Sequence, residues 1–376
     1  MTMFNKEMFM KELEILVNID SGSDDMEGLH KVADYLAKQY EEAGLTVKRT
    51  VQGELNRPYM EVYTHPEEEE IDILFLGHLD TVFPAGTVAE RPYSLSEDGK
   101  VAYGPGVGDM KAGDLLALYL TRELMEVRPD LRICICHNSD EEIGSEDSME
   151  AMQNVAARSR YGFVLEPGRI GGHFVYQRKG VVDVLVKCRG IASHAGNAPK
   201  DGASAILALA DLITKMSALT DFETGLTVNA GLISGGTGSN VVAEDAEAVF
   251  DIRYTSFEQL AEFEAKLDEL VKAPVVKGVT ATWKKLAQMP PMEPNDRTVE
   301  MMDLLRGEAE KLGQKPDFLS VGGASDGSLL SEMGTAVMDG CGPESDKYHS
   351  VDEYLLVDTI EERYNLLLGA MKGIGR

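Results

Sequence analysis

The stretch "IDILFLGHLDTVF", residues 71–83, decides the fold. Its first six residues are predominantly apolar, which is typical of a strand buried on both faces. Gly77 ends this run, and His78 and Asp80 follow with one residue between them. On its own, His78 is more simply explained as a histidine in a turn. A buried strand has little reason to end in a histidine and an aspartate, however, unless its far end carries chemistry.

Segments on both sides of this strand alternate between helical and strand-like patterns. Helical periodicity runs through residues 28–44 and 111–127, and apolar strand-like runs occupy residues 131–139 and 161–167. This alternation predicts an α/β domain whose largely parallel sheet is flanked by helices. In such folds, catalytic groups gather just beyond the carboxyl ends of the strands.

The pattern changes near Arg178. The segment "GVVDVLVKCRG", residues 180–190, alternates with a period of two, and the chain then reads helix, strand, strand, helix, strand up to residue 289. This order predicts a smaller α+β, ferredoxin-like domain with one half-exposed sheet. We therefore expect a discontinuous catalytic domain, residues 1–178 and 290–376, interrupted by an inserted domain at residues 179–289.

The composition limits the kinds of partner and the cellular compartment that we expect for this protein. The 376 residues include 36 Lys and Arg against 64 Asp and Glu, a net charge of −28, which argues against nucleic-acid and membrane partners. The sequence shows neither a signal peptide nor an apolar run of about 18 residues. Its cysteines are too few and scattered for a disulfide framework, which predicts a cytoplasmic protein. Cys134 and Cys136 share one face of a strand, where we expect core packing, with a redox or metal role as the alternative.

Further acidic and imidazole side chains recur where strands end. Asp109 lies in the glycine-rich "YGPGVGDMKAG", Glu141 and Glu142 follow residues 131–139, Glu166 follows the next strand, and His349 lies far along the chain. Each has a plain explanation alone, such as a helix cap for Asp109 or a solvated surface for the glutamate pair. Together, two histidines and several carboxylates form a ligand set for divalent metals of the zinc type. Without a cation, such an anionic cluster would repel itself.

The chain resembles the dinuclear zinc metallopeptidases and deacylases, a family that includes glutamate carboxypeptidase, aminoacylase, acetylornithine deacetylase and succinyl-diaminopimelate desuccinylase. The motifs that carry the resemblance are "GHLDTV", "GPGVGDMKAG", "SDEEIGS", "LEPG", "GIASHAG" with "GGTGSNVV", and "YHSVDEYL". They occur in family order along essentially the whole chain, and "GHLDTVFPAGT" is most similar to the glutamate carboxypeptidase branch. The resemblance implies a zinc-exopeptidase-like mixed sheet and an inserted lid or dimerisation domain.

The resemblance also implies a ligand set for two Zn²⁺ ions, with Co²⁺ or Mn²⁺ as possible substitutes. His78 and Glu166 would bind one ion, Glu142 and His349 the other, and Asp109 would bridge both. By the same analogy, Asp80 would hydrogen-bond to His78 and fix its tautomer.

The remaining catalytic roles follow from the same resemblance. Glu141 would act as general base toward a water shared by the two ions. His194 and Asn240 would stabilise the oxyanion, often across a dimer interface, although His194 alone is more simply explained as a histidine in a turn. The family also commonly has a cis peptide after the bridging aspartate, here between Asp109 and Met110.

The resemblance implies hydrolysis of a small peptide at its C-terminal bond or of an N-acyl amino acid. An N-acetyl or N-succinyl deacylase is the alternative, and a non-catalytic homologue that binds a peptide is a third. Arg253 matches a family arginine, but Gln288 and Met289 stand where the carboxypeptidase branch has a carboxylate-binding arginine, which argues against a C-terminal glutamate preference. Gly322 and Gly323 are expected to line the specificity pocket or to form a structural turn. A homodimer through the inserted domain is expected by analogy.

Overall fold

A computed structural model describes residues 4–375, which divide into two compact units. The first unit contains the chain up to Gln177, Pro294–Ser320, and the chain from Ser325 onward. The second unit contains Arg178–Glu293 together with Val321–Ala324. Each unit has its own apolar core.

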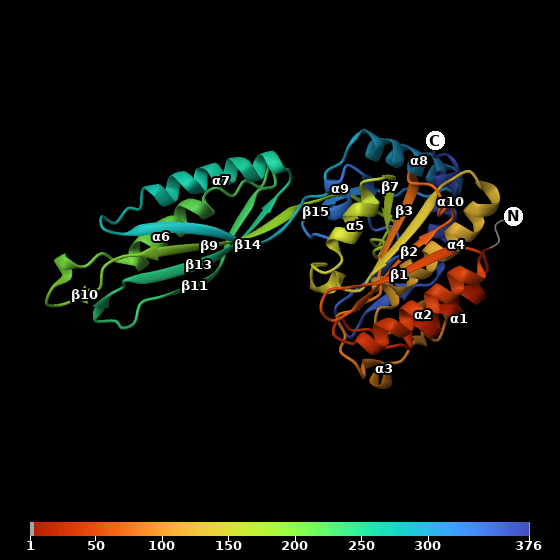
Figure 1. The fold of residues 1–376 in the computed structure, drawn as a ribbon, viewed down its shortest axis with the longest axis horizontal. Helices are drawn as coiled ribbons and strands as arrows, with labels where there is room; N and C mark the ends of the chain where they lie inside the picture. Colours follow the sequence, from red (N-terminus) through yellow and green to blue (C-terminus); the bar gives the residue numbers. More distant parts are fainter. Residues whose placement is uncertain (1–3, 376) are drawn as a thin grey trace. The chain divides into compact units, whose positions relative to one another are not determined.

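The central sheet of the first unit is mixed and largely parallel (Figure 1). In spatial order its strands are β1 (Thr46–Gln52), β2 (Arg57–Tyr63), β6 (Ile133–Asn138), β3 (Ile71–His78), β7 (Ser159–Val164) and β16 (Ala336–Met338). Strands β6, β3, β7 and β16 run parallel to one another, whereas β1 and β2 form an antiparallel edge. The predicted α/β class with a largely parallel sheet is confirmed.

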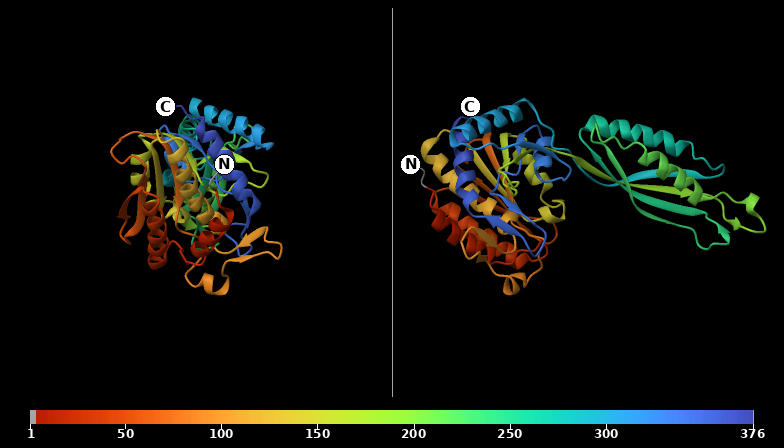
Figure 2. Two further views of the ribbon diagram at one scale, coloured as in Figure 1. Left: turned by 90° about the vertical axis from the view of Figure 1, so that its right-hand side faces the viewer. Right: turned by 180° about the vertical axis from the view of Figure 1, so that it is seen from behind.

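Helices cover both faces of this sheet (Figures 1 and 2). On one face lie α2 (Met26–Glu42) and α4 (Ala112–Val127), and on the other lie α5 (Met149–Ala156) and α9 (Gly327–Glu332). Every residue of β3 is buried as a result, which explains its almost continuous apolar sequence. The remaining long helices are α1 (Lys6–Val17), α8 (Asp296–Leu312) and α10 (Asp358–Lys372).

Short elements complete the first unit. Strands β17 (Ser345–Asp346), β18 (Tyr354–Leu356), β5 (Val101–Tyr103) and β4 (Ser94–Leu95) form a small antiparallel sheet, and α3 spans Thr87–Glu90. Strand β8 (Phe174–Arg178) pairs with β15 (Phe318–Val321), and all but the last residue of each belongs to this unit. Within residues 4–375, no helix is both long enough and apolar enough to cross a membrane.

The parallel strands bring three loops to one edge of the sheet. In the register of β3 and β6, His78 lies opposite Asn138, and Leu76 of β3 lies opposite Val164 of β7. Strands β3 and β6 therefore end at the same level and β7 ends two residues earlier, so the segments that follow all three start at the same edge of the sheet. This edge is the one at which the sequence predicts ligand side chains.

The second unit has the order strand, helix, strand, strand, helix, strand. Its elements are β9 (Gly180–Arg189), α6 (Ala205–Ser217), β11 (Thr227–Gly235), β13 (Asp245–Tyr254), α7 (Phe257–Lys272) and β14 (Thr280–Met289). The sheet is antiparallel with the order β11, β13, β9, β14, and both helices lie along one of its faces (Figure 1). Alternate residues of β9 are buried, because only that face is covered. This is the ferredoxin-like arrangement.

The cysteines lie in the cores of the two units. All four thiols are free and buried, and the Cys134 and Cys136 sulfurs lie 3.9 Å apart on β6. Burial raises the pKa of the Cys134 thiol well above its usual range. A buried thiol of this kind packs as a small apolar group and is a poor nucleophile.

Candidate metal centre

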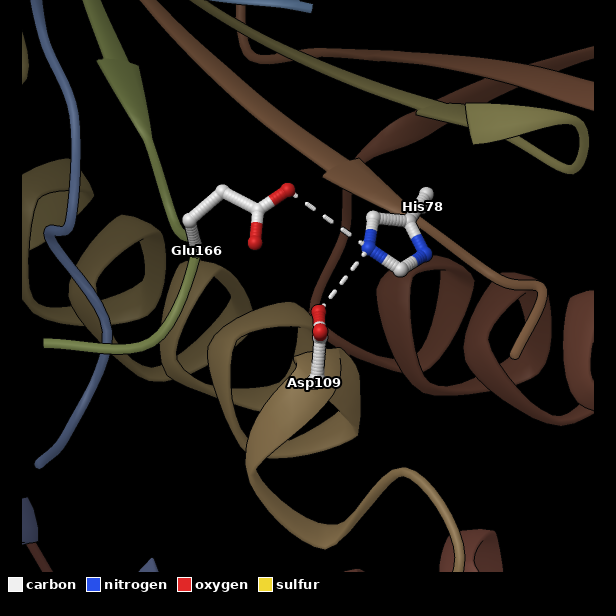
Figure 3. A group of neighbouring side chains, drawn as sticks. All are labelled: His78, Asp109 and Glu166. Carbon is white, nitrogen blue, oxygen red and sulfur yellow. Dashed lines mark hydrogen bonds and ion pairs between the residues drawn. The ribbon is translucent and has the colours of Figure 1, made fainter. Parts of the chain in front are cut away.

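His78 is buried at the end of β3 and presents one ring nitrogen to two carboxylates (Figure 3). Its Nδ1 lies 3.0 Å from the backbone oxygen of Asp80. Its Nε2 lies 3.2 Å from Asp109 Oδ1 and 3.6 Å from Glu166 Oε1. Because a carbonyl oxygen only accepts hydrogen bonds, the neutral ring carries its proton on Nδ1. The Nε2 lone pair then faces two anionic groups, an arrangement that suits a cation shared by all three.

Asp109 connects this group to a second one. Its Oδ2 lies 3.3 Å from Nε2 of His349, and the same nitrogen lies 3.1 Å from Oε2 of Glu142. The ligand atoms of His78, Asp109 and Glu166, and those of Asp109, Glu142 and His349, each lie within 4.8 Å of one another. The two oxygens of Asp109 therefore serve two neighbouring groups of donors. Its side chain caps no helix, and the Asp109–Met110 peptide is cis, as the resemblance implies.

Glu353 fixes the glycine-rich turn that carries Asp109. Its buried carboxylate accepts hydrogen bonds from the backbone N–H groups of Gly106 at 3.0 Å, Gly108 at 2.9 Å and Asp109 at 3.1 Å. A Cβ at Gly108 would clash with Ser345, so this position has room only for glycine. Sequence reasoning did not single out Glu353, although it lies within the quoted "YHSVDEYL" motif.

Asp80 holds the loop that carries the two glutamates. Its carboxylate accepts hydrogen bonds from the backbone N–H groups of Glu141 at 3.3 Å and Glu142 at 3.2 Å, and from Ser23 Oγ at 2.7 Å. The carboxylate also lies 3.4 Å from His78 Nδ1, slightly farther than the backbone oxygen of the same residue. The side chain and the main chain of Asp80 therefore both help to fix the orientation of the imidazole.

The adjacent glutamates have different environments. Glu142 faces His349, whereas Glu141, among the described residues, belongs to neither ligand group. Burial raises the pKa of Glu141 well above its usual range; His78 opposes this shift, while Asp326, Glu142 and Asp109 reinforce it. Burial and the nearby Asp109 likewise raise the pKa of Glu166. These shifts reflect several carboxylates crowded into a buried space.

The pKa values of the two imidazoles are also raised, which in a histidine favours the charged form. Hydrogen bonds to Asp109 and Glu142 raise the pKa of His349 to about 10. The pKa of His78 is also raised well above its usual value, because the effects of Asp109, Asp80 and Glu166 outweigh that of burial. The cluster thus favours positive charge at the ring nitrogens, and a divalent metal ion would replace those protons.

The sequence matches a known family along most of its length. Residues 74–373 match Peptidase family M20/M25/M40. The chain belongs to this family. The relation to metallopeptidases and deacylases that the motifs predict is thereby confirmed.

Two curated relatives of this M20 protein illustrate the range of the family. Carboxypeptidase G2 of Pseudomonas sp. (strain RS-16) is 31% identical over 264 residues, which cover 69% of this chain and 62% of that protein, so the match spans less than two thirds of the relative. Succinyl-diaminopimelate desuccinylase of Hydrogenovibrio crunogenus is 25% identical over 310 residues, covering 77% of this chain and 80% of the relative.

Solved structures agree in fold. Aminopeptidase PepT from Bacillus cereus ATCC 10987 superposes with a TM-score of 0.80 at 22% identity, with complete coverage of both chains. The Bacillus subtilis YXEP protein, described as a dinuclear metal-binding peptidase of the M20 family, gives a TM-score of 0.70 at 13% identity and covers 98% of this chain and 97% of that one. At these identities the likeness shows the fold alone.

The other predicted site residues of the M20 protein lie in the second unit. His194 is exposed, in β10 (Ser193–His194), which pairs with β12 (Val241–Val242). Its Nδ1 accepts hydrogen bonds from the backbone N–H groups of Gly196 and Asn197, both at 3.1 Å. The proton of the neutral ring is therefore on Nε2, which is left as a donor. Asn240 is also exposed, and its backbone oxygen accepts from Ala195 N–H at 2.9 Å.

Arg253 already has an acidic partner. Its Nη2 lies 2.7 Å from Oδ2 of Asp251, and its Nη1 lies 3.5 Å from the backbone oxygen of Gly322. Gly322 and Gly323 are exposed. Roles of these three residues in substrate binding stay predictions.

Proposed function

We propose that this M20 protein is a metal-dependent amidohydrolase that cleaves the C-terminal peptide bond of a small peptide or the amide of an N-acyl amino acid. The observation that carries this proposal is the pair of ligand groups that share Asp109. Relatives named as a carboxypeptidase and as a desuccinylase support both substrate types. The second candidate, an N-acetyl or N-succinyl deacylase, follows from the desuccinylase relatives.

The donor set fits two divalent ions of the zinc type. His78, Asp109 and Glu166 would hold one ion, and Asp109, Glu142 and His349 the other. Imidazole nitrogen with carboxylate oxygen is a combination that zinc prefers, and cobalt or manganese accepts the same donors. When bound, such ions polarise a substrate carbonyl and lower the pKa of water.

Glu141 is the proposed general base. Its carboxylate takes a proton from the attacking water and later delivers that proton to the leaving amine nitrogen. The raised pKa makes this buried carboxylate a stronger base than an exposed glutamate, which favours the transfer of the proton from water. Asp80 supports this role through the backbone N–H of Glu141.

His194 and Asn240 are proposed to stabilise the oxyanion that develops on the substrate. A ring whose Nδ1 accepts backbone hydrogen bonds presents Nε2–H as a donor, which is the group an oxyanion requires. Arg253, with Gly322 and Gly323, is proposed to contact the acidic portion of the substrate. A substrate carboxylate at Arg253 must compete with Asp251, so we expect weak selection for an acidic C-terminal residue.

We further propose a cytoplasmic homodimer formed through the second unit. Strand β11 is an edge of its sheet and exposes Leu232 (68%) and Ile233 (65%), and the adjoining helix α6 exposes Ile206 (43%) and Leu207 (60%). An unpaired strand edge beside exposed apolar side chains is a surface that favours pairing with another chain. We call these four residues the β11–α6 surface.

Metal analysis combined with a hydrolysis panel tests the proposed function. The panel contains dipeptides, N-acetyl amino acids and N-succinyl amino acids, and products are identified by mass spectrometry before and after chelation. We expect two divalent ions per chain, one for each ligand group, and metal-dependent release of a free amino acid. Turnover of acylated substrates alone would favour the deacylase. A metal-loaded protein that hydrolyses nothing would favour the non-catalytic alternative.

A further inference from the structure

The proposed base Glu141 lies on a tight loop, residues 139–145, which we call the base loop. The backbone N–H of Gly144 donates to the Glu141 oxygen at 2.9 Å, and that of Ser145 donates to the Asp140 oxygen at 2.8 Å. Ser145 has a φ of 56°, in the left-handed region that a non-glycine residue occupies at a cost. The loop therefore depends on contacts outside its own backbone to keep this path.

Asp326 connects the two ends of the base loop. Asn138, immediately before the loop, donates from Nδ2 to Asp326 Oδ2 at 2.7 Å. Ser145, at the end of the loop, donates from Oγ to Asp326 Oδ1 at 2.5 Å. The carboxylate is buried, with 3% exposure, and lies at the start of α9. Because both partners are donors, an ionised carboxylate satisfies both at once.

Asn138 extends this connection to the strand that carries His78. Its backbone oxygen accepts a hydrogen bond from Leu79 N–H at 2.8 Å, directly after His78. Asp80, the next residue, holds the loop from the other side through the N–H groups of Glu141 and Glu142. The base loop is thus held between two buried carboxylates, Asp80 and Asp326.

We propose that Asp326 is a positioning residue for the hydrolytic reaction, which it serves by clamping both ends of the base loop so that Glu141 stays aligned. This inference rests on the proposed function. The sequence predicts that the neighbouring Gly322 and Gly323 line a specificity pocket or form a structural turn. Asp326 turns inward to Asn138 and Ser145 and contacts the loop that bears the base.

Removing the clamp should affect turnover more than substrate binding. In Asp326→Ala, Ser145 loses the carboxylate to which it donates, and Asn138 keeps only longer hydrogen bonds, at 3.3 Å, to the hydroxyls of Ser145 and Ser148. The base loop then gains freedom to move. A misplacement of about 1 Å costs on the order of 100-fold in rate. We therefore expect kcat, measured at saturating metal, to fall roughly 10- to 100-fold, while KM changes by less than about threefold.

A charge swap separates positioning from a general loss of packing. Asn138→Asp places two carboxylates against each other and should lower kcat at least as strongly as Asp326→Ala. Adding Asp326→Asn to that variant restores the pair in reverse: the amide nitrogen at position 326 donates to the carboxylate at position 138. The amide oxygen at position 326 still accepts the hydrogen bond from Ser145. The double variant should recover most of the kcat that Asn138→Asp loses.

The matched control is Asp72→Asn. Asp72 is a fully buried carboxylate at the start of β3, paired with Arg132 at 2.8 Å. Its replacement should reduce stability and leave kcat within about twofold of wild type, because it lies at the opposite end of the strand from His78.

Hydrogen exchange gives a readout that does not depend on activity. The amides of Gly144 and Ser145 should lose protection in Asp326→Ala, while the amides of β3 stay protected. The proposed role of Asp326 is refuted if the loop amides keep their protection in Asp326→Ala or if that variant has the kcat of the wild type. It is also refuted if the kcat of the double variant is no higher than that of Asn138→Asp. If the wild type hydrolyses no substrate, the proposed function fails, and exchange still decides whether Asp326 holds the loop. If Asp326→Ala does not fold, the charge swap decides the question.

Discussion

At the scale of single residues, Glu141 gives the sharpest test of the site. Glu141→Gln keeps the size of the side chain but removes its ability to take a proton, so kcat should fall by about 10²- to 10⁴-fold. Metal content should stay unchanged, because Glu141 belongs to neither ligand group among the described residues. Metal analysis and steady-state kinetics on the same preparation measure both quantities.

The adjacent Glu142 supplies the control for that experiment. Glu142→Gln makes the same chemical change on a residue that faces His349, so it should weaken binding of one of the two ions. Substantial activity in Glu141→Gln would exclude Glu141 as the base. Equal loss of metal in both variants would show that the two glutamates do not have separate roles.

His349 makes metal uptake depend on pH. Its pKa is raised to about 10 in the metal-free protein, so the ring is protonated below that pH, whereas a ring bound to metal is neutral. Metal binding must then release a proton from His349, so the apparent affinity for metal should rise as pH increases toward 10. Calorimetric titration with Mn²⁺ in buffers of different ionisation enthalpy measures the protons released. Binding without proton release at pH 7 would contradict this prediction.

The sequence predicts the candidate ligands that cluster in the structure, and it predicts Asp80 beside His78, but it does not predict the other contacts that hold these side chains in place. His78 and Asp109 stand out because imidazole and carboxylate groups at strand ends have a specific chemistry. Glu353 has no such signal, since an acid beside a histidine motif resembles any solvated side chain until its three backbone donors are seen. The contact between His78 and the backbone oxygen of Asp80 is equally invisible, because every residue has that oxygen.

At the scale of elements, the packing of β3 against α4 sets the position of His78 at the end of β3. A Cβ at Gly77 would clash with Asp114 of α4 and approach His137 of β6. Gly77→Ala should therefore move the end of β3, lower the free energy of unfolding by roughly 1 to 3 kcal/mol and weaken metal binding. Urea denaturation and metal titration measure the two effects.

Gly307 is the matched glycine for that experiment. It lies within α8, and a Cβ there would meet no atom within 4 Å. Gly307→Ala should therefore stabilise the protein by about 0.5 to 1 kcal/mol and leave metal affinity unchanged. A Gly77→Ala variant as stable as wild type would show that β3 can adjust its position without affecting the site.

The order of the elements was predictable, whereas the contacts between distant loops were not. Alternation of helical and apolar strand patterns indicates parallel strands, and a period of two indicates the half-covered sheet of the second unit. The position of Asp326 beside Asn138 depends on how β16 and α9 join the sheet after a gap of 188 residues. Local periodicity carries no information about such a long-range pairing.

At the scale of the whole molecule, net charge and the β11–α6 surface have opposing effects on self-association. A charge of −28 per chain repels a second copy, and this repulsion weakens as salt screens it. Burial of Leu232, Ile233, Ile206 and Leu207 favours association, and the apolar gain changes little with moderate salt. The proposed dimer should therefore tighten as ionic strength rises from about 0.01 to 0.15 M.

Substitution on β11 tests which surface forms the dimer. Leu232→Lys introduces a charged, strongly hydrated group on an edge strand, a change that blocks pairing with another strand. We expect analytical ultracentrifugation to show a dimer for the wild type and a monomer for this variant at the same concentration. Val51→Lys is the control, because Val51 is 51% exposed on β1, an edge strand of the other unit.

If His194 acts across the interface, loss of the dimer in Leu232→Lys should also lower kcat, whereas kcat should stay unchanged in Val51→Lys. A wild type that is monomeric at assay concentrations, or a Leu232→Lys variant that remains dimeric, would exclude this surface.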